Sequence, residues 1–399
     1  MKRSVNDLAV FDGAPTFSEP IHVGRPNIGN RARLFEHLAD ILERRWLTNN
    51  GPLVQRFENR VAQLLGVQHC VAVCNATLGL QVLGRALGLT GEVVMPAFTF
   101  VATAHAFSWI GLQPLFCDVS MKSHNLDPTD AETLVSPRTS AIVGVHCWGQ
   151  PCEPIRLGEI ATRRGLALLF DAAHAFGCKV GQRMIGSFGN AEVFSFHATK
   201  FVNSFEGGVV TTNDDRLAAE LRLLINFGFT GYDSVVSYGT NAKMSEIHAA
   251  MGLVSLDSMD AIVEVNRSHY IRYLHNLSHL DAVRIFRYPE EIDSNYQYVV
   301  IEIDPQLSPI SRDDVLTVFH AEGVLVRRYF YPGCHRMAPY AGSGLAQPRS
   351  LPNTEKLVQR VLLLPSGTAM SEESINEVTE LLDFCIRHGE EISSRLNRR

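Results

Sequence analysis

The sequence has no long apolar run, no signal-like N-terminus and no excess of charge of one sign. No segment approaches the roughly 20 consecutive apolar residues that a membrane-spanning helix requires. The basic residues within positions 1–8 are not followed by an apolar stretch, so no signal peptide is predicted. Acidic and basic residues are interspersed and the formal net charge is −6, which argues against a protein of nucleic-acid or membrane surfaces.

Several binding motifs are also missing. The eight cysteines form no Cys-x-x-Cys pair, and the closest spacing joins Cys70 and Cys74. They are typical of reduced core thiols in a cytoplasmic protein, and no metal site is predicted. No Gly-x-Gly-x-x-Gly follows an expected strand, which argues against a nicotinamide enzyme. Internal repeats and low-complexity segments are absent as well.

What the chain does contain is a regular alternation of expected strands and helices. With 399 residues and 46% hydrophobic content it can bury a large core and a second, smaller one. Apolar strands are expected at residues 70–74, 93–100, 114–119, 140–147, 166–171 and 192–196, with helices between them. This alternation predicts an α/β fold with a mostly parallel central sheet and helices on both faces. Longer helices follow, so we expect a large domain with an N-terminal lead-in at 1–265 and a small C-terminal α+β domain at 266–399.

One lysine follows an apolar strand closely. Lys200 comes soon after the expected strand, in a loop that ends at Glu206-Gly207-Gly208. The carboxyl ends of parallel strands are where such sheets build their sites. The glycines predict a turn with positive φ. A partly desolvated lysine there suits a Schiff base to a carbonyl cofactor, although a solvated loop lysine is the common alternative.

A carboxylate ends the strand that precedes the lysine strand in the chain. Asp171 closes the apolar run 166–170, and His174 follows three residues later. A buried carboxylate is costly unless it is paired. It would suit a protonated pyridine nitrogen, and a structural cap of the next turn is an equal alternative from the residues alone.

The turn after the first strand is a potential phosphate site. Asn75 or Thr77 can cap the helix that follows, and the N-terminus of a helix favours an anion. An ordinary helix cap is the competing interpretation.

Taken together, these blocks resemble the DegT/DnrJ/EryC1/StrS family of pyridoxal-phosphate sugar aminotransferases. The resemblance is carried, in the family's order, by Ala76-Thr77, Asp171-x-x-His174, Ser195 to Lys200 with Glu206-Gly-Gly, and Asn241-x-Lys243-Met-x-Glu246. It implies a fold-type I pyridoxal 5'-phosphate enzyme whose catalytic lysine is Lys200. It further implies cofactor contacts for Ala76, Thr77, Phe98, Asp171, His174, Ser195 and Asn241, and substrate contacts for Tyr331 and His335.

Some residues depart from the family pattern. Lys243 replaces the usual arginine, so no role is assigned to it, and none to His197. Phe205 replaces the usual glycine before Glu206 and makes the chain most similar to the subgroup that aminates C4 of TDP-4-keto-6-deoxyglucose. The resemblance therefore implies transamination of a nucleotide-linked ketosugar, with glutamate as donor, in a cytoplasmic homodimer whose active sites are shared through Asn241.

Two other functions remain open on the sequence. A related sugar dehydratase removes an oxygen at C3, but that branch has histidine where this chain has Lys200. A non-catalytic regulator that binds a sugar nucleotide or the cofactor could use the same fold.

Overall fold

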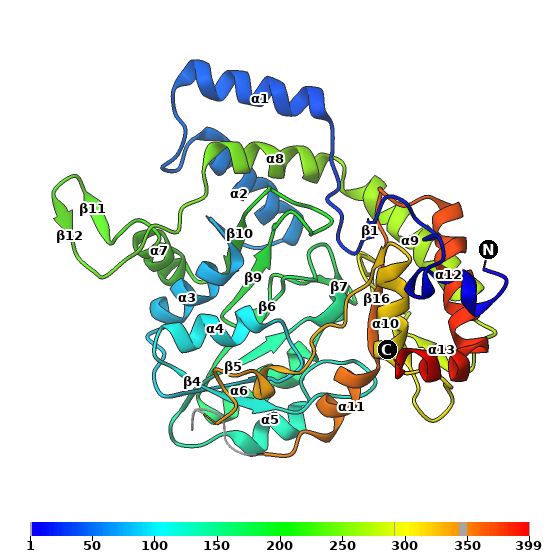
Figure 1. Cartoon of the computed structure of the whole chain (residues 1–399). Helices are drawn as coiled ribbons and strands as arrows, with labels where there is room; N and C mark the ends of the chain where they lie inside the picture. Colours follow the sequence, from blue (N-terminus) through cyan, green and yellow to red (C-terminus); the bar gives the residue numbers. More distant parts are fainter. Residues whose placement is uncertain (1, 291, 343–348, 399) are drawn as a thin grey trace.

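A seven-stranded sheet forms the centre of the computed structural model, which describes residues 2–290, 292–342 and 349–398 (Figure 1). Its strand order is β2-β10-β9-β6-β5-β3-β4. The strands are β2 (His69–Val73), β10 (Gly208–Thr212), β9 (Ala191–Ser195), β6 (Ala167–Asp171), β5 (Thr139–Val145), β3 (Glu92–Pro96) and β4 (Gln113–Cys117). Only β10 runs opposite to the other six. The predicted, mostly parallel sheet is confirmed.

Helices cover both faces of this sheet, and each face has its own apolar core. Residues of α2 (Pro52–Leu65), α5 (Pro128–Leu134), α6 (Pro154–Arg164) and α8 (Glu246–Asp257) belong to one core. Residues of α3 (Ala76–Ala86), α4 (Val101–Trp109) and α7 (Asp215–Leu224) belong to the other. Because the strands are buried on both sides, their sequences are nearly continuous apolar runs.

The C-terminal part contains a second, antiparallel sheet of order β13-β14-β16 (Val283–Ile285, Val299–Ile303 and Val361–Leu364). Helices pack against it in a separate core: α9 (Met259–Asn276), α10 (Arg312–Ala321), α12 (Glu372–Arg387) and α13 (Gly389–Leu396). Helix α11 (Pro352–Arg360) lies next to β14. Val5, Leu8 and Phe11 from the N-terminus join this core. Strand β1 (Ile21–His22) pairs with β15 (Val324–Leu325). The boundary expected at 265/266 falls inside α9 and stays a prediction.

Two elements extend from the body of the molecule. Helix α1 (Arg31–Arg44) lies along α8, and the hairpin of β11 (Phe229–Gly231) and β12 (Ser234–Val235) projects away from the sheet (Figure 1). Large apolar side chains on both are exposed, among them Phe35, Leu42, Phe229, Tyr232 and Val235. A further short hairpin joins β7 (Lys179–Val180) and β8 (Arg183–Met184). None of the helices in the described residues is long and apolar enough to cross a membrane.

Of the helix N-caps predicted from the sequence, one is confirmed and one is not. Asn75 caps α3, because its side chain accepts a hydrogen bond from Leu78 N at 2.9 Å. Ser245 precedes α8 as expected, but its hydroxyl pairs with His248 Nδ1 at 2.6 Å instead of capping the helix.

The turn after the lysine loop differs from the prediction. Phe205, not a glycine, takes the left-handed conformation with φ 61°, and neither Gly207 nor Gly208 has a positive φ. The glycines are required for space instead. A Cβ on Gly208 would lie 2.8 Å from Ala76 N and 2.9 Å from Phe194 O, and one on Gly207 would lie 2.1 Å from Ser204 Oγ. The start of β10 therefore packs directly against the turn that begins α3.

This close contact predicts a difference between two glycine-to-alanine substitutions. Gly208→Ala should lower the free energy of unfolding by about 1–3 kcal/mol, because backbone atoms at under 3 Å have to move apart. Gly158→Ala in helix α6 is the control, because a Cβ on Gly158 would contact only Leu168 Cδ2, at 3.9 Å. It should be neutral or stabilising by about 0.5–1 kcal/mol. Urea unfolding measures both, and equal stabilities would contradict the packing.

Candidate active site

Three of the predicted site residues, Asp171, Ser195 and Lys200, lie where β6 and β9 end. Asp171 is the last residue of β6 and lies opposite Val193 of the parallel strand β9. Two residues further on, β9 ends at Ser195 and the chain turns into the loop that carries Lys200. The carboxylate and the lysine therefore lie at the same edge of the sheet, as the sequence predicted.

The Asp171 carboxylate is buried and has no ion pair within 4 Å among the described residues. Thr103 Oγ1 donates to Oδ2 at 2.8 Å, and the N–H of Ala173 donates to Oδ1 at 3.1 Å. Burial raises the pKa of Asp171, while these two donors and the nearby Lys200 oppose the rise. Asp171 thus caps its own turn and still lacks a cationic partner that would offset its burial.

The amine of Lys200 is partly buried in the same region. Its Nζ donates to the hydroxyl of Tyr298 at 3.1 Å. Removal from water lowers the pKa of Lys200 to about 8, although the charge of Asp171 acts in the opposite direction. A larger fraction of neutral amine near neutral pH makes this side chain a better nucleophile than a solvated lysine.

His174 lies beside this pair as a neutral ring. Its Nδ1 accepts a hydrogen bond from Trp148 N at 3.3 Å, which leaves the proton on Nε2. Burial holds the pKa of His174 well below its usual value, and the charge of Lys200 adds to this. The ring stacks on Trp148, with centroids 5.7 Å apart and planes at 19°, and contacts Tyr298 at 4.4 Å. His174 therefore offers one fixed N–H donor.

The residues of the candidate phosphate site come together at the N-terminus of α3. Ala76 and Thr77 are the first two residues of α3, whose leading N–H groups have no acceptor inside the helix. Gly208, which packs against Ala76, is paired with Ser195 in the sheet. Ser195 and the start of α3 therefore come together around a point where the helix dipole favours an anion.

Phe98 does not lie where a stacking role requires it. The ring is fully buried and packs edge-on against Phe330, Trp148 and His124 at centroid distances of 5.2, 6.1 and 5.8 Å, so it presents no face to a ligand. Phe100 is the residue just before α4, at its N-cap position, and is half exposed. It lies one turn before Thr103, the residue that donates to Asp171, and positions three apart share one face of a helix.

The remaining predicted residues lie outside this cluster. Asn241 is exposed and forms a bridge with Asn226 at the base of the β11–β12 hairpin. The guanidinium groups of Arg328 and Arg312 lie over the ring of Tyr331, 4.2 and 5.6 Å from its centroid. His335 is mostly buried, with Glu355 Oε1 3.7 Å from its Nε2. In the described residues, no hydrogen bond or ring contact joins these three to Lys200, Asp171 or His174.

The two residues without an assigned role have local partners. Lys243 Nζ lies over the ring of Phe227, 4.7 Å from its centroid. His197 Nδ1 pairs with Thr199 Oγ1 at 2.9 Å, and its Nε2 lies 3.4 Å from Glu206 Oε1.

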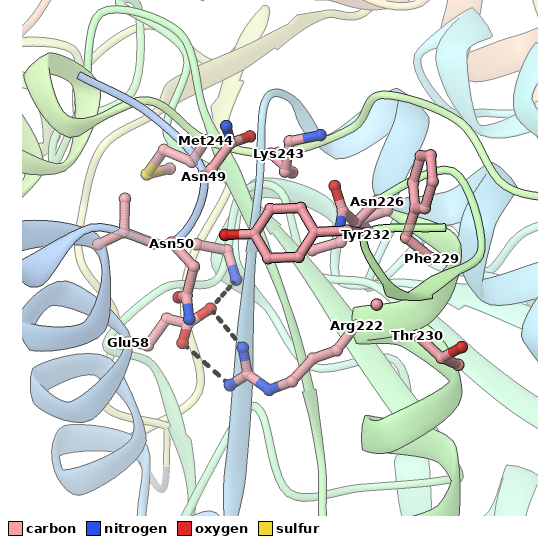
Figure 2. A pocket seen from close by; sticks show the side chains of 14 residues that line it. Asn49, Asn50, Glu58, Arg222, Asn226, Phe229, Thr230, Tyr232, Lys243 and Met244 are labelled. Atoms are coloured by element: carbon pink, nitrogen blue, oxygen red, sulfur yellow. Dashed lines mark hydrogen bonds and ion pairs between the residues drawn. The ribbon is translucent and has the colours of Figure 1, made fainter. Parts of the chain in front are cut away.

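A cavity of about 690 Å³ lies elsewhere, between the hairpin and the edge strand β2 (Figure 2). It contains none of the predicted site residues. Glu58 accepts from Ala72 N at 2.7 Å, and Arg222 pairs with Glu58 at 2.9 Å and donates to Cys70 O at 3.2 Å. This ion pair occupies the free backbone groups of β2 and protects the edge of the sheet.

Three further residues contribute to the site without a signal in the sequence. Thr103, Trp148 and Tyr298 each contact a predicted residue, but they come from a helix, a short 3₁₀ turn (Cys147–Gly149) and the approach to β14. Threonines and aromatic residues are common in cores, and only the fold shows which of them reach the lysine.

A parallel α/β sheet with a buried carboxylate and a desolvated lysine at one edge defines a class of enzymes that use a carbonyl cofactor. The family model described as the DegT/DnrJ/EryC1/StrS aminotransferase family matches residues 30–383, and the chain belongs to this family. The seven-stranded sheet and its covering helices are accordingly the fold of the pyridoxal-phosphate aminotransferases.

Individual relatives match over nearly their whole length. The chain is 36% identical over 364 residues to the dTDP-4-amino-4,6-dideoxy-D-glucose transaminase of Escherichia coli, covering 91% of this chain and 98% of that one. It is 31% identical over 372 residues to the GDP-perosamine synthase of Caulobacter vibrioides, with 91% and 97% covered. A solved structure of DesI in the presence of its TDP-sugar product has 51% identity and a TM-score of 0.95 over 99% of this chain and all of that one.

The burial of Lys200 predicts a pH-dependent stability in the cofactor-free protein. The unfolded chain binds a proton at this lysine up to about pH 10.4, whereas the folded chain releases it near pH 8. Stability therefore rises between these values. Relative to Lys200→Met, the wild type should gain about 1 kcal/mol from pH 8 to 10, after allowing for the partial exposure of the side chain.

Urea unfolding at several pH values measures this gain. Lys179→Met controls for the general effect of replacing a lysine, because the Lys179 side chain is 41% exposed and pairs with Asp293 at 3.2 Å. Parallel curves for the wild type and Lys200→Met would show that the lysine is solvated.

Proposed function

We propose that this protein transfers an amino group from glutamate to a nucleotide-linked ketosugar, with pyridoxal 5'-phosphate as cofactor, in the biosynthesis of deoxyaminosugars. The observation that carries the proposal is the desolvated amine of Lys200 at the sheet edge where the buried, unpaired carboxylate of Asp171 lies. The best substrate candidate is TDP-4-keto-6-deoxyglucose. Lys200 argues against the dehydratase branch, in which this position is histidine.

The residues present fit this cofactor. The Asp171 carboxylate has two hydrogen-bond donors but no cation, which suits a protonated pyridine nitrogen. His174 has a fixed N–H on Nε2 that suits the ring hydroxyl. Ala76, Thr77 and Ser195 surround the anion site at the start of α3. We assign the stacking contact to Phe100 instead of Phe98, because only Phe100 has an exposed face.

Each side chain then has a defined task. The cofactor supplies the electron sink for moving a proton between carbon and nitrogen. Lys200 anchors the cofactor through its neutral amine, and once that amine is free it accepts and returns the proton as a general base and acid. Asp171 keeps the ring nitrogen protonated, so that the sink stays effective. The buried aromatic residues around His174 exclude water from the proton transfer.

The similarities support the substrate class. One relative acts on a dTDP-linked 4-amino-4,6-dideoxy sugar, and the solved structure with 51% identity was determined with a TDP-sugar product. Tyr331 and His335 remain proposed sugar contacts. We also propose that the protein is cytoplasmic, where the amino donor glutamate is present. The free cysteines of the described residues are consistent with this location.

We further infer a homodimer in which each subunit completes the other's site. Several large apolar side chains of α1 and of the β11–β12 hairpin are exposed in the single chain, and a partner subunit would cover them. Asn241, which bridges to Asn226 at the base of this hairpin, is exposed. In the dimer its amide would reach the partner's phosphate site.

Product analysis tests the function directly. Incubation with glutamate and TDP-4-keto-6-deoxyglucose should give the 4-amino-4,6-dideoxy sugar by mass spectrometry and NMR, and a GDP-linked ketosugar tests the choice of nucleotide. Borohydride should fix the cofactor to the peptide that contains Lys200. Lys200→Ala should bind the cofactor and lose about 10²–10⁴-fold in turnover. Cofactor fixed to another lysine, or no turnover with any ketosugar, would overturn the proposal.

Complementation between two inactive variants tests the shared site. Lys200→Ala lacks the amine, and Asn241→Asp sets a carboxylate against the phosphate. In a mixed dimer one site carries both defects and the other carries none. Random exchange makes about half the dimers mixed, so roughly a quarter of wild-type activity should return. If subunit exchange is verified and activity stays at the parental level, Asn241 does not act across the interface.

A further inference from the structure

The segment 295–298, which leads into β14 of the C-terminal sheet, is docked onto both loops of the active site. Asn295 Nδ2 donates to His174 O at 2.9 Å and to Phe176 O at 3.1 Å. Gln297 Nε2 donates to Thr199 O at 3.1 Å, and Gln297 Oε1 accepts from Phe201 N at 3.3 Å. The side chain of Gln297 therefore holds the backbone on both sides of Lys200.

Tyr298 completes this contact by reaching the lysine side chain itself. Its hydroxyl, 3.1 Å from Nζ, is the one hydrogen-bond partner of the Lys200 amine that the described part of the chain provides. The Tyr298 ring is buried against His174 and Trp148, with centroids 4.4 and 5.6 Å away. The hydroxyl of Tyr288 bonds both Trp148 O, at 2.9 Å, and Tyr298 O, at 3.3 Å. The phenol thus has little freedom to move away from the amine.

On the basis of the proposed function, we propose that Tyr298 is a positioning residue of the transamination site, whose phenol oxygen holds the Lys200 amine and stabilises its protonated form. Gln297 fixes the backbone of the lysine loop, and Tyr298 fixes the amine at its end. Between the two halves of the reaction the amine is free of the cofactor and has four rotatable bonds. A single neutral acceptor keeps it at the sheet edge without binding it as tightly as a carboxylate would.

The other groups that face the Lys200 amine explain why a phenol can stabilise its protonated form. From β6 comes the carboxylate of Asp171, from the 3₁₀ turn the thiol of Cys147, and from the loop after β6 the ring of His174. Burial raises the pKa of Cys147 and of Tyr298 well above their usual values, and it lowers that of His174. These shifts hold Cys147, Tyr298 and His174 in their neutral forms at pH 7, which leaves Asp171 as the carboxyl group that faces the amine. Tyr298 is the group that touches the amine.

The pKa of Lys200 in the variant Tyr298→Phe, compared with that in the wild type, tests this role. The substitution keeps the ring and its packing but removes the acceptor from the ammonium form. A hydrogen bond to a charged group is worth one to two units of pKa when buried, and partial access of water to Lys200 reduces this to about one unit. Trace acetylation of the full-length protein is measured across pH by mass spectrometry of the peptide that contains Lys200. The pH midpoint of Lys200 acetylation should be about one unit lower in Tyr298→Phe than in the wild type.

The measurement is made without cofactor and again with pyridoxamine 5'-phosphate, the form that leaves the lysine free. In the active enzyme, kcat of Tyr298→Phe should fall about tenfold with an unchanged KM for the sugar, because the proton carrier is misplaced. Tyr273→Phe is the matched control: it is a buried phenol that donates to Pro365 O at 2.9 Å and has no contact with Lys200. It should leave both the midpoint and kcat unchanged.

Gln297→Leu separates positioning of the amine from general loosening of the loop. It removes both backbone contacts beside Lys200 but leaves the phenol in place, so the midpoint should stay within about 0.3 units of the wild type. An unchanged midpoint in Tyr298→Phe, or an equal shift in Gln297→Leu, overturns the proposal. Because the midpoint is also read without cofactor, this outcome is independent of whether the protein proves to be an aminotransferase.

Discussion

The structure of the site depends on the cost of burying two opposite charges at the end of a parallel sheet. Asp171 is placed there by a strand that is apolar on both faces, so its carboxylate cannot reach bulk water. Two hydrogen bonds and a lysine that lies nearby but makes no ion pair compensate only in part, and its pKa rises. A cationic ligand would remove this cost. The fold therefore leaves at this edge a buried carboxyl group that a cationic ligand would stabilise.

The second constraint is that the lysine loop is long and has little structure of its own. Between Ser195 and Gly208 the chain forms no strand or helix. It is held from outside, through Asn27 Nδ2 on Phe201 O at 3.1 Å and through Gln297 on both sides of Lys200. These contacts come from the N-terminal lead-in and the C-terminal part. The loop that carries Lys200 at the edge of the large sheet is thus fixed by segments far away in sequence.

Parts of this arrangement were predictable because they depend on local patterns. Strands buried on both faces are apolar runs, and a charged residue at the end of such a run marks the edge of the sheet; Asp171 was found in this way, and Lys200 by its place shortly after the next strand. Asn75 was identified as a possible cap from its place before a periodic helix. The positive-φ turn predicted at Gly207-Gly208 was wrong: Phe205 takes the positive φ, Gly208 begins β10, and the two glycines are required for close packing instead.

The sequence by itself determined the alternation of strands and helices, because this follows from hydrophobic periodicity. It also determined Lys200, Asp171 and the helix cap Asn75, because each lies at or shortly after the end of an apolar strand. Tertiary structure decided which ordinary residues join them. Phe98 and Phe100 differ by two positions in one aromatic loop, yet the first is sealed in the core and the second is exposed beside Thr103. Tyr298 lies 98 residues from Lys200 and reaches it only because the C-terminal sheet docks at that edge. Such contacts depend on packing between distant segments, which no local pattern records.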